Sequence, residues 1–290
     1  MEIVWFLLAI VSALSHSIKG MFQKINLKDI NSNTLIFVLS WLSTLFWIPF
    51  IITMWIPDIS LKLILVFVLW SILFYIWKLF HFKALQIEDI SYISPLMWLV
   101  TVWVVFLWML FLNEIPSVYW VTGIWFILIW VYFLNLQKYH TKFFEPIRHL
   151  YKNKWSQLFL ITVICYSFTN IFDKIWVAES YPIFWIFLMN LSLFIISSFK
   201  LNKTFKTDIL FFKKHSVLLL ITFFFYVLGH ITQMTAIQYI FIWYMSAIKT
   251  ASLLFTIILW GIFFKEKNIL KKFIYWLIIV MGLIFIYLGK

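Results

Sequence analysis

Long apolar runs are the feature that most constrains what this chain can fold into. Ten stretches have about the 20 mainly apolar residues that an α-helix needs to cross a bilayer. They are 2–22, 33–56, 61–80, 90–112, 117–136, 156–178, 182–199, 216–238, 241–264 and 270–288. Charged residues make up only 12% of the 290 positions, against about a quarter in a soluble domain. Because backbone groups in lipid must be hydrogen-bonded within the protein, we predict an all-α membrane protein with ten transmembrane helices.

The chain also repeats itself at a constant spacing. The identical pairs are Ala84 and Ala236, Gln86 and Gln238, Ile90 and Ile242, Tyr92 and Tyr244, Ser94 and Ser246, Trp108 and Trp260, Phe111 and Phe263, and Glu114 and Glu266. Five helices per copy is an odd number, so consecutive copies enter the membrane from opposite sides. We predict two inverted five-helix repeats, 1–137 and 156–290, joined by a basic loop at 138–155; inverted repeats are typical of secondary transporters.

The net charge of +12 comes mostly from lysines in the short connections. Of the 23 Lys and Arg residues, 18 lie in the odd-numbered connections, whereas the opposite side has only Lys62, Lys174 and Lys290. The positive-inside rule explains this distribution without a nucleic-acid partner. The same rule predicts that both termini are external.

Few features of the sequence favour an enzyme. Cys165 is the single cysteine, which excludes an intramolecular disulfide and a cysteine-based metal site. Zinc-protease, nucleophile-elbow and phosphate-loop motifs are absent. We therefore expect no catalytic activity, cofactor or metal, and we keep a membrane-embedded enzyme that uses His16, His81 or His230 as the minor alternative.

Polar side chains recur at helical spacing on spans one, three, four, six, eight and nine. Because such groups are costly in lipid unless they face a partner or water, these spans are predicted to line a central cavity. The candidate substrate-binding residues are Lys249, Lys19, His16, Ser94, Trp98, Tyr75, Tyr166, Asn170, Tyr226, His230 and Ser246. For the serines and threonines, hydrogen bonding within their own helix or packing between helices is the alternative.

Lys249 is the most informative of these residues. It lies deep in the ninth span, where its ammonium group is too far from either interface to snorkel comfortably. We expect it to bind an anionic substrate group or to pair with a buried acid, for which Asp173 is the candidate. Asp173, His16 and His230 are candidates for proton coupling, since histidine titrates near neutral pH. A structural hydrogen bond is the alternative for each histidine.

The two repeated stretches resemble the drug/metabolite transporter superfamily, specifically proteins built from two EamA-like domains. The resemblance is carried by ALQIEDISYISPLMWLVTVWVVFLWMLFLNEI at 84–115, by TAIQYIFIWYMSAIKTASLLFTIILWGIFFKEK at 235–267, and by Lys24 and Lys174. The usual glycine before the closing glutamate is replaced by Asn113 in one copy and by Lys265 in the other. The resemblance implies cytoplasmic termini, in conflict with the charge count, and the orientation stays open.

The resemblance further implies alternating-access transport of a small polar metabolite. Because Lys249 can hold an anion, we expect an amino acid or another solute with a carboxylate or phosphate group. We expect a monomer or homodimer in the cell (inner) membrane of a bacterium or archaeon, with protons as a candidate coupling ion. Two other functions stay open. One is export of an amphipathic or cationic compound through an aromatic-lined cavity, since the chain has 18 Trp and 34 Phe. The other is a non-transporting scaffold or lipid-handling protein.

Overall fold

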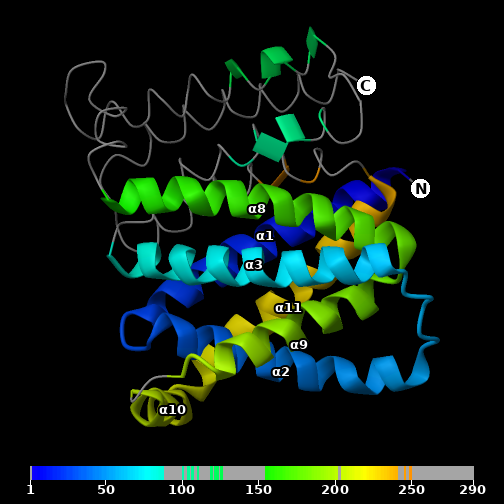
Figure 1. Cartoon of the computed structure of the whole chain (residues 1–290). Coiled ribbons are helices and arrows are strands. Elements are labelled where there is room, and N and C mark those ends of the chain that lie inside the picture. The colour runs from blue at the N-terminus through cyan, green and yellow to red at the C-terminus, as the bar shows by residue number, and fades with distance from the viewer. Residues whose placement is uncertain are drawn as a thin grey trace, which may run out of the picture.

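The computed structural model describes residues 2–87, 154–201 and 204–240, together with positions 100, 103–104, 106–107, 110, 118–119, 121–123, 125–126, 245 and 248–249. Within this part, the chain forms helices and no strands. The helices are α1 (Glu2–Leu27), α2 (Ser32–Thr53), α3 (Leu61–Ile87), α8 (Lys154–Glu179), α9 (Pro182–Ser198), α10 (Phe205–Lys214) and α11 (Ser216–Tyr239) (Figure 1).

Six of these helices coincide with predicted membrane spans. By length and composition, four described segments can cross a membrane, namely Val4–Leu27, Ser32–Thr53, Leu61–Gln86 and Ser216–Tyr239, and Pro182–Ser198 is a shorter apolar helix. The expectation of a helical membrane protein is therefore confirmed. The predicted spans 90–112, 117–136, 241–264 and 270–288 lie wholly or largely outside the described residues.

Two helices continue well past the ends that hydropathy predicted. The helix α1 ends at Leu27 rather than near residue 22, and α3 ends at Ile87 rather than near residue 80. Hydropathy marks where apolar residues give way to polar ones, whereas backbone hydrogen bonding continues beyond that point. As a result, polar residues assigned to connections lie on helices.

Helix α10 was not predicted as a separate element. Of its ten residues, Asp208 and Phe212 are buried one helical turn apart, and its last turn is basic. The Asp208 carboxylate accepts hydrogen bonds from the Thr34 hydroxyl (2.6 Å) and the Asn31 backbone amide (3.3 Å). A short amphipathic helix is therefore fastened to the first turn of α2.

The most extensive helix contacts join the two halves of the chain. Helix α1 packs along α11, α3 along α8, and α2 along α9 (Figure 1). The hydrophobic core lies between these pairs and includes three fully buried tryptophans. Trp176 and Trp185 stack with ring centres 4.7 Å apart, and Trp70 meets Trp185 edge-on at 5.1 Å. Because these indoles cover each other's faces, they serve as packing and do not form an open cage for a cation.

Two residues that recur in the other half of the sequence, Lys174 and Gln86, each cap the end of a neighbouring helix. The Lys174 ammonium donates to the carbonyls of Ile237 and Ile240 at the end of α11. The Gln86 amide of α3 donates to Leu27 (3.0 Å) and Ile30 (2.9 Å) at the end of α1. The last carbonyls of a helix lack intrahelical partners, so these side chains satisfy groups that would otherwise be unpaired.

Gly229 allows α11 to approach α1 closely. A Cβ at Gly229 would lie 3.1 Å from the His16 ring, whereas a Cβ at Gly20 would meet nothing within 4 Å. The Gly229 carbonyl also accepts a hydrogen bond from the buried Ser12 hydroxyl (3.0 Å). An alanine here would have to displace an imidazole that hydrogen bonds hold on both sides.

We expect Gly229→Ala to lower the free energy of unfolding by about 1–2 kcal/mol, the usual cost of overpacking a close contact. Gly20→Ala is the matched control, with a neutral or slightly stabilising effect from helix propensity. Thermal unfolding of the two purified variants, followed by tryptophan fluorescence, measures the difference. Equal melting temperatures would show that the helices separate at no cost.

Candidate functional site

Tyr226 of α11 is the centre of a buried polar cluster. Its hydroxyl donates to Asn190 Oδ1 of α9 (2.7 Å) and accepts a hydrogen bond from the Lys78 ammonium of α3 (3.0 Å). The side chains are almost fully enclosed, because Tyr226 is 1% exposed and Lys78 is 3% exposed. The Lys78 ammonium also lies 4.6 Å from the centre of the Tyr226 ring. Three helices thus meet at one phenol.

A second ammonium group approaches the same ring from α1. The Lys19 nitrogen lies 5.6 Å from the Tyr226 ring centre and 2.7 Å from His16 Nδ1. An ammonium can only donate, so Nδ1 accepts and Nε2 carries the imidazole hydrogen. Nε2 then donates to Gln233 Oε1 of α11 (2.8 Å). The chain of hydrogen bonds from Lys19 through His16 to Gln233 joins α1 to α11.

His230 completes the cluster on α11. Its ring stacks on Tyr226 with centres 4.4 Å apart and meets His16 edge-on at 5.4 Å. His230 is 5% exposed, and its Nδ1 is buried without a hydrogen-bond partner among the described residues. A buried polar atom without a partner is uncommon in a folded protein and calls for an explanation.

Lys249 lies near a second tyrosine. Its ammonium donates to the Tyr166 hydroxyl of α8 (3.1 Å), and the Trp77 ring of α3 stacks on Tyr166 with centres 4.2 Å apart. Lys249 and Tyr166 are partly exposed, unlike the enclosed Tyr226 cluster. This contact therefore presents a cation that a solute can reach.

Three lysines, Lys19, Lys78 and Lys249, lie in the part of the interior that the structure describes. Lys19 repels both Lys78 and Lys249 electrostatically. The buried acid Asp173 accepts a hydrogen bond from Trp185 Nε1 (3.0 Å) and attracts Lys249. Removing an ammonium group from water without compensation costs several kcal/mol. An anion inside this cluster would supply that compensation.

The structure brings some predicted site residues together and separates others. Lys19, His16, Tyr226 and His230 share the cluster described above, and Lys249 contacts Tyr166. Tyr75 instead donates to Asn33 Oδ1 (2.8 Å), and Asn170 donates to the carbonyl of Tyr166 on its own helix (2.6 Å), so these two make structural hydrogen bonds. Ser94, Trp98 and Ser246 lie outside the described residues.

Lys78, Asn190 and Gln233 were absent from the predicted site. Lys78 lies within the predicted span 61–80, although its charge was counted with the basic connections, and the structure places it on α3. Asn190 carried a usable signal, as a polar residue within an apolar span. Gln233 lies one turn from His230 on the same helix, so the polar face of α11 could have identified it.

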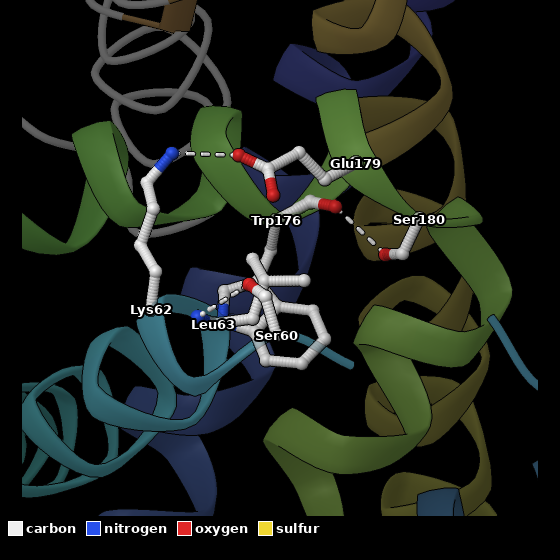
Figure 2. Close-up of polar contacts among 6 residues, drawn as sticks. All are labelled: Ser60, Lys62, Leu63, Trp176, Glu179 and Ser180. Carbon is white, nitrogen blue, oxygen red and sulfur yellow. Dashed lines mark hydrogen bonds and ion pairs between the residues drawn. The ribbon is translucent and has the colours of Figure 1, made fainter. Parts of the chain in front are cut away.

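An ion pair at one end of the bundle lies outside this cluster. Figure 2 shows Lys62, near the start of α3, beside Glu179 at the end of α8, with 2.7 Å between nitrogen and oxygen. The Ser60 hydroxyl accepts a hydrogen bond from the Leu63 amide (3.3 Å) and caps the first turn of α3. The two charged side chains are 64% and 40% exposed.

We expect Lys62→Met and Glu179→Gln each to change the free energy of unfolding by less than about 1 kcal/mol, because exposed ion pairs contribute little. Thermal unfolding at low and high salt measures the effect. A loss well above this value, abolished by salt, would show that the pair holds the end of the bundle closed.

Comparisons with known proteins give a family for the first half and a fold for most of the chain. Residues 3–136 match the EamA-like transporter family. A solved crystal structure, described only as that of a protein, matches with a TM-score of 0.71, 10% sequence identity, and coverage of 98% of this chain and 96% of its own. At that identity the likeness concerns the fold alone. No curated protein matches the chain.

The region matched to the family includes α1, α2 and α3, and therefore both Lys19 and Lys78. Its helices are among those with the length and composition to cross a membrane. The match of residues 3–136 to the EamA-like transporter family and the apolar helices together support an integral multi-pass membrane protein.

Proposed function

We propose that the chain is a secondary transporter of a small anionic metabolite in the cell membrane of a bacterium or archaeon. It alternates access to a central site between two inverted five-helix repeats, 1–137 and 156–290, with 138–155 as the connecting loop. The solute carries a carboxylate or phosphate group. The observation that carries the proposal is the group of lysines that α1, α3 and the 248–249 segment direct to neutral hydrogen-bond partners.

The pairing of helices supports the inverted repeat. In the repeat, α1 corresponds to α8, α2 to α9 and α3 to α11. Exchanging the two halves converts the α1–α11 pair into the α8–α3 pair and returns the α2–α9 pair to itself. These are the three pairs with the most extensive contacts. A two-fold axis that passes between α2 and α9 would generate this pattern.

Contacts within the cluster cross between the halves, as alternating access requires. Lys78 of the first half bonds Tyr226 of the second, and His16 of the first half bonds Gln233 of the second. A solute that binds these groups contacts both repeats at once. Its binding energy can therefore bias the relative position of the halves.

A solute screen on the purified, detergent-solubilised chain tests this function. Binding to the folded state raises the melting temperature by mass action. We expect carboxylates or phosphates to raise it and to compete for uptake into proteoliposomes. Stabilisation by organic cations alone would support the cation exporter instead. Stabilisation by no solute, together with no flux, would support a scaffold.

Lys249 provides a separate prediction for this function. We expect Lys249→Met to reduce solute flux several-fold, because the variant keeps the bulk of the side chain but loses its charge. Such a reduction corresponds to a loss of about 1 kcal/mol of transition-state stabilisation. Lys249→Arg should keep much of the flux. Proteoliposome uptake of the best anion from the screen measures both. Unchanged flux in Lys249→Met would exclude Lys249 from the transport route.

A further inference from the structure

We propose that the Tyr226 cluster binds a solute with two negative charges, a phosphate monoester or a dicarboxylate, in preference to a monoanion or a zwitterionic amino acid. This inference rests on the proposed function and narrows its substrate class. The cluster consists of Lys19, Lys78, Tyr226, His230 and His16.

Two ammonium groups flank one ring, and neither has an acidic partner in the described part of the chain. Lys78 bonds the Tyr226 hydroxyl, and Lys19 bonds His16 Nδ1. Each ammonium has three N–H donors and uses one of them in these bonds. Both groups therefore retain donors for a ligand, and both lie within 5.6 Å of the same ring centre.

The two ammonium groups of the cluster determine how many negative charges a solute needs to neutralise them. A monoanion would neutralise one ammonium and leave the other uncompensated in an enclosed site. A dianion neutralises both, and the interaction is strong because little water screens it. Among the described residues, the buried acids are Asp173 and Asp208, whose carboxylates are bonded to Trp185 and to Thr34 and not to either lysine.

His230 supplies an independent indication of a ligand. Its Nδ1 is buried and lacks a partner in the described part of the structure, while its ring stacks on Tyr226 and meets the His16 ring edge-on. As a donor, this nitrogen would bind a third anionic oxygen. Buried polar atoms without partners are rare in folded proteins and call for such an explanation.

The same arrangement disfavours an amino acid. Its carboxylate would fit beside either lysine, but its ammonium group would meet two further cations. In the described residues, the acceptors beside these lysines are the Tyr226 hydroxyl, the Asn190 and Gln233 amide oxygens and His16 Nδ1. The Tyr226 hydroxyl, both amide oxygens and His16 Nδ1 already have donors, whereas His230 Nδ1 has no partner among the described residues. The cluster therefore selects against a positive charge on the solute.

Matched probes on the wild-type chain test the inference without a variant. At mildly alkaline pH methyl phosphate carries two charges and dimethyl phosphate carries one, and succinate and its monomethyl ester form the same pair among carboxylates. Calorimetric titration of the purified protein should give affinities about tenfold higher or more for one or both dianions, the effect of one additional charge-assisted hydrogen bond. The pair with the larger ratio identifies phosphate or dicarboxylate chemistry.

Variants then assign the preference to the cluster. We expect Lys19→Met to lower the ratio of dianion to monoanion affinity toward one while monoanion binding persists, and Lys62→Met to leave the ratio unchanged. Equal affinities of the wild type for both members of each pair, or tighter binding of alanine than of succinate and methyl phosphate, would overturn the inference but keep an anion transporter. Absence of binding by every anion would overturn the proposed function as well.

Discussion

Lys78→Met is expected to weaken anion binding by roughly one to two orders of magnitude. A hydrogen bond to a charged group contributes about 1.5–3 kcal/mol, and tenfold in affinity corresponds to about 1.4 kcal/mol. Lys78 is enclosed, so water cannot replace its charge once methionine takes its place. The Tyr226 hydroxyl would also lose the donor that now fixes it. Calorimetric titration with methyl phosphate and with succinate measures the loss.

The control is Lys62→Met on the same helix, where the same substitution removes an exposed ammonium that bonds only at the end of the bundle. Tyr226→Phe should have a smaller effect on affinity, because both ammonium groups stay in place. If Lys78→Met bound both anions as tightly as the wild type, Lys78 would be a structural lysine that only orients Tyr226. Equal melting temperatures of variant and wild type would confirm that the fold is intact.

Apolar runs predicted six of the described helices because helix formation and membrane insertion depend on the same local property. A backbone in lipid has no alternative to the helix, so tertiary context rarely changes the outcome. The ends of α1 and α3 were predicted poorly, since hydropathy detects the lipid boundary and not the last hydrogen bond. Lys78 lay inside the predicted span 61–80, but it was counted with the basic connections and so was missed as a site residue.

The candidate site could be predicted only where its residues lie at helical spacing on a single helix. His16 and Lys19 are three residues apart on α1, and Tyr226 and His230 are four apart on α11, so the helical period alone placed each pair on one face. The contact of Lys78 with Tyr226 depends on how α3 and α11 pack, which no local pattern specifies. The same holds for the bond between Tyr226 and Asn190.

Residues 200–215 show a second limit of sequence reasoning. Their lysines predicted a solvated connection, and α10 indeed ends in Lys213 and Lys214. The acid in the middle of that basic segment gave no sign of its partners, because Thr34 and Asn31 precede it by more than 170 residues. A buried carboxylate beside the start of α2 is also favoured by the positive end of the helix dipole.

Asp208→Ala is therefore expected to lower the free energy of unfolding of this region by about 3 kcal/mol, because it leaves the Thr34 hydroxyl and the Asn31 amide without their acceptor. Asp208→Asn should have an intermediate effect, since its amide oxygen can accept one of the two hydrogen bonds. Thermal unfolding measures the global part. Limited trypsin digestion measures local unfolding of α10. The side chains of Lys206, Lys213 and Lys214 are already exposed, but the protease can cleave after them only when the helix backbone opens.

Asp29→Ala is the matched control, because Asp29 is an exposed acid at the end of α1 and its removal should change neither measurement. A local effect would appear as faster cleavage at α10 with an unchanged melting temperature. A global effect would appear as a lower melting temperature as well, which would mean that the start of α2 and the α2–α9 pair depend on this contact. If Asp208→Ala matched Asp29→Ala in both measurements, the buried carboxylate would not hold α10 on the bundle, and the helix would be retained by Phe212 and its apolar neighbours alone.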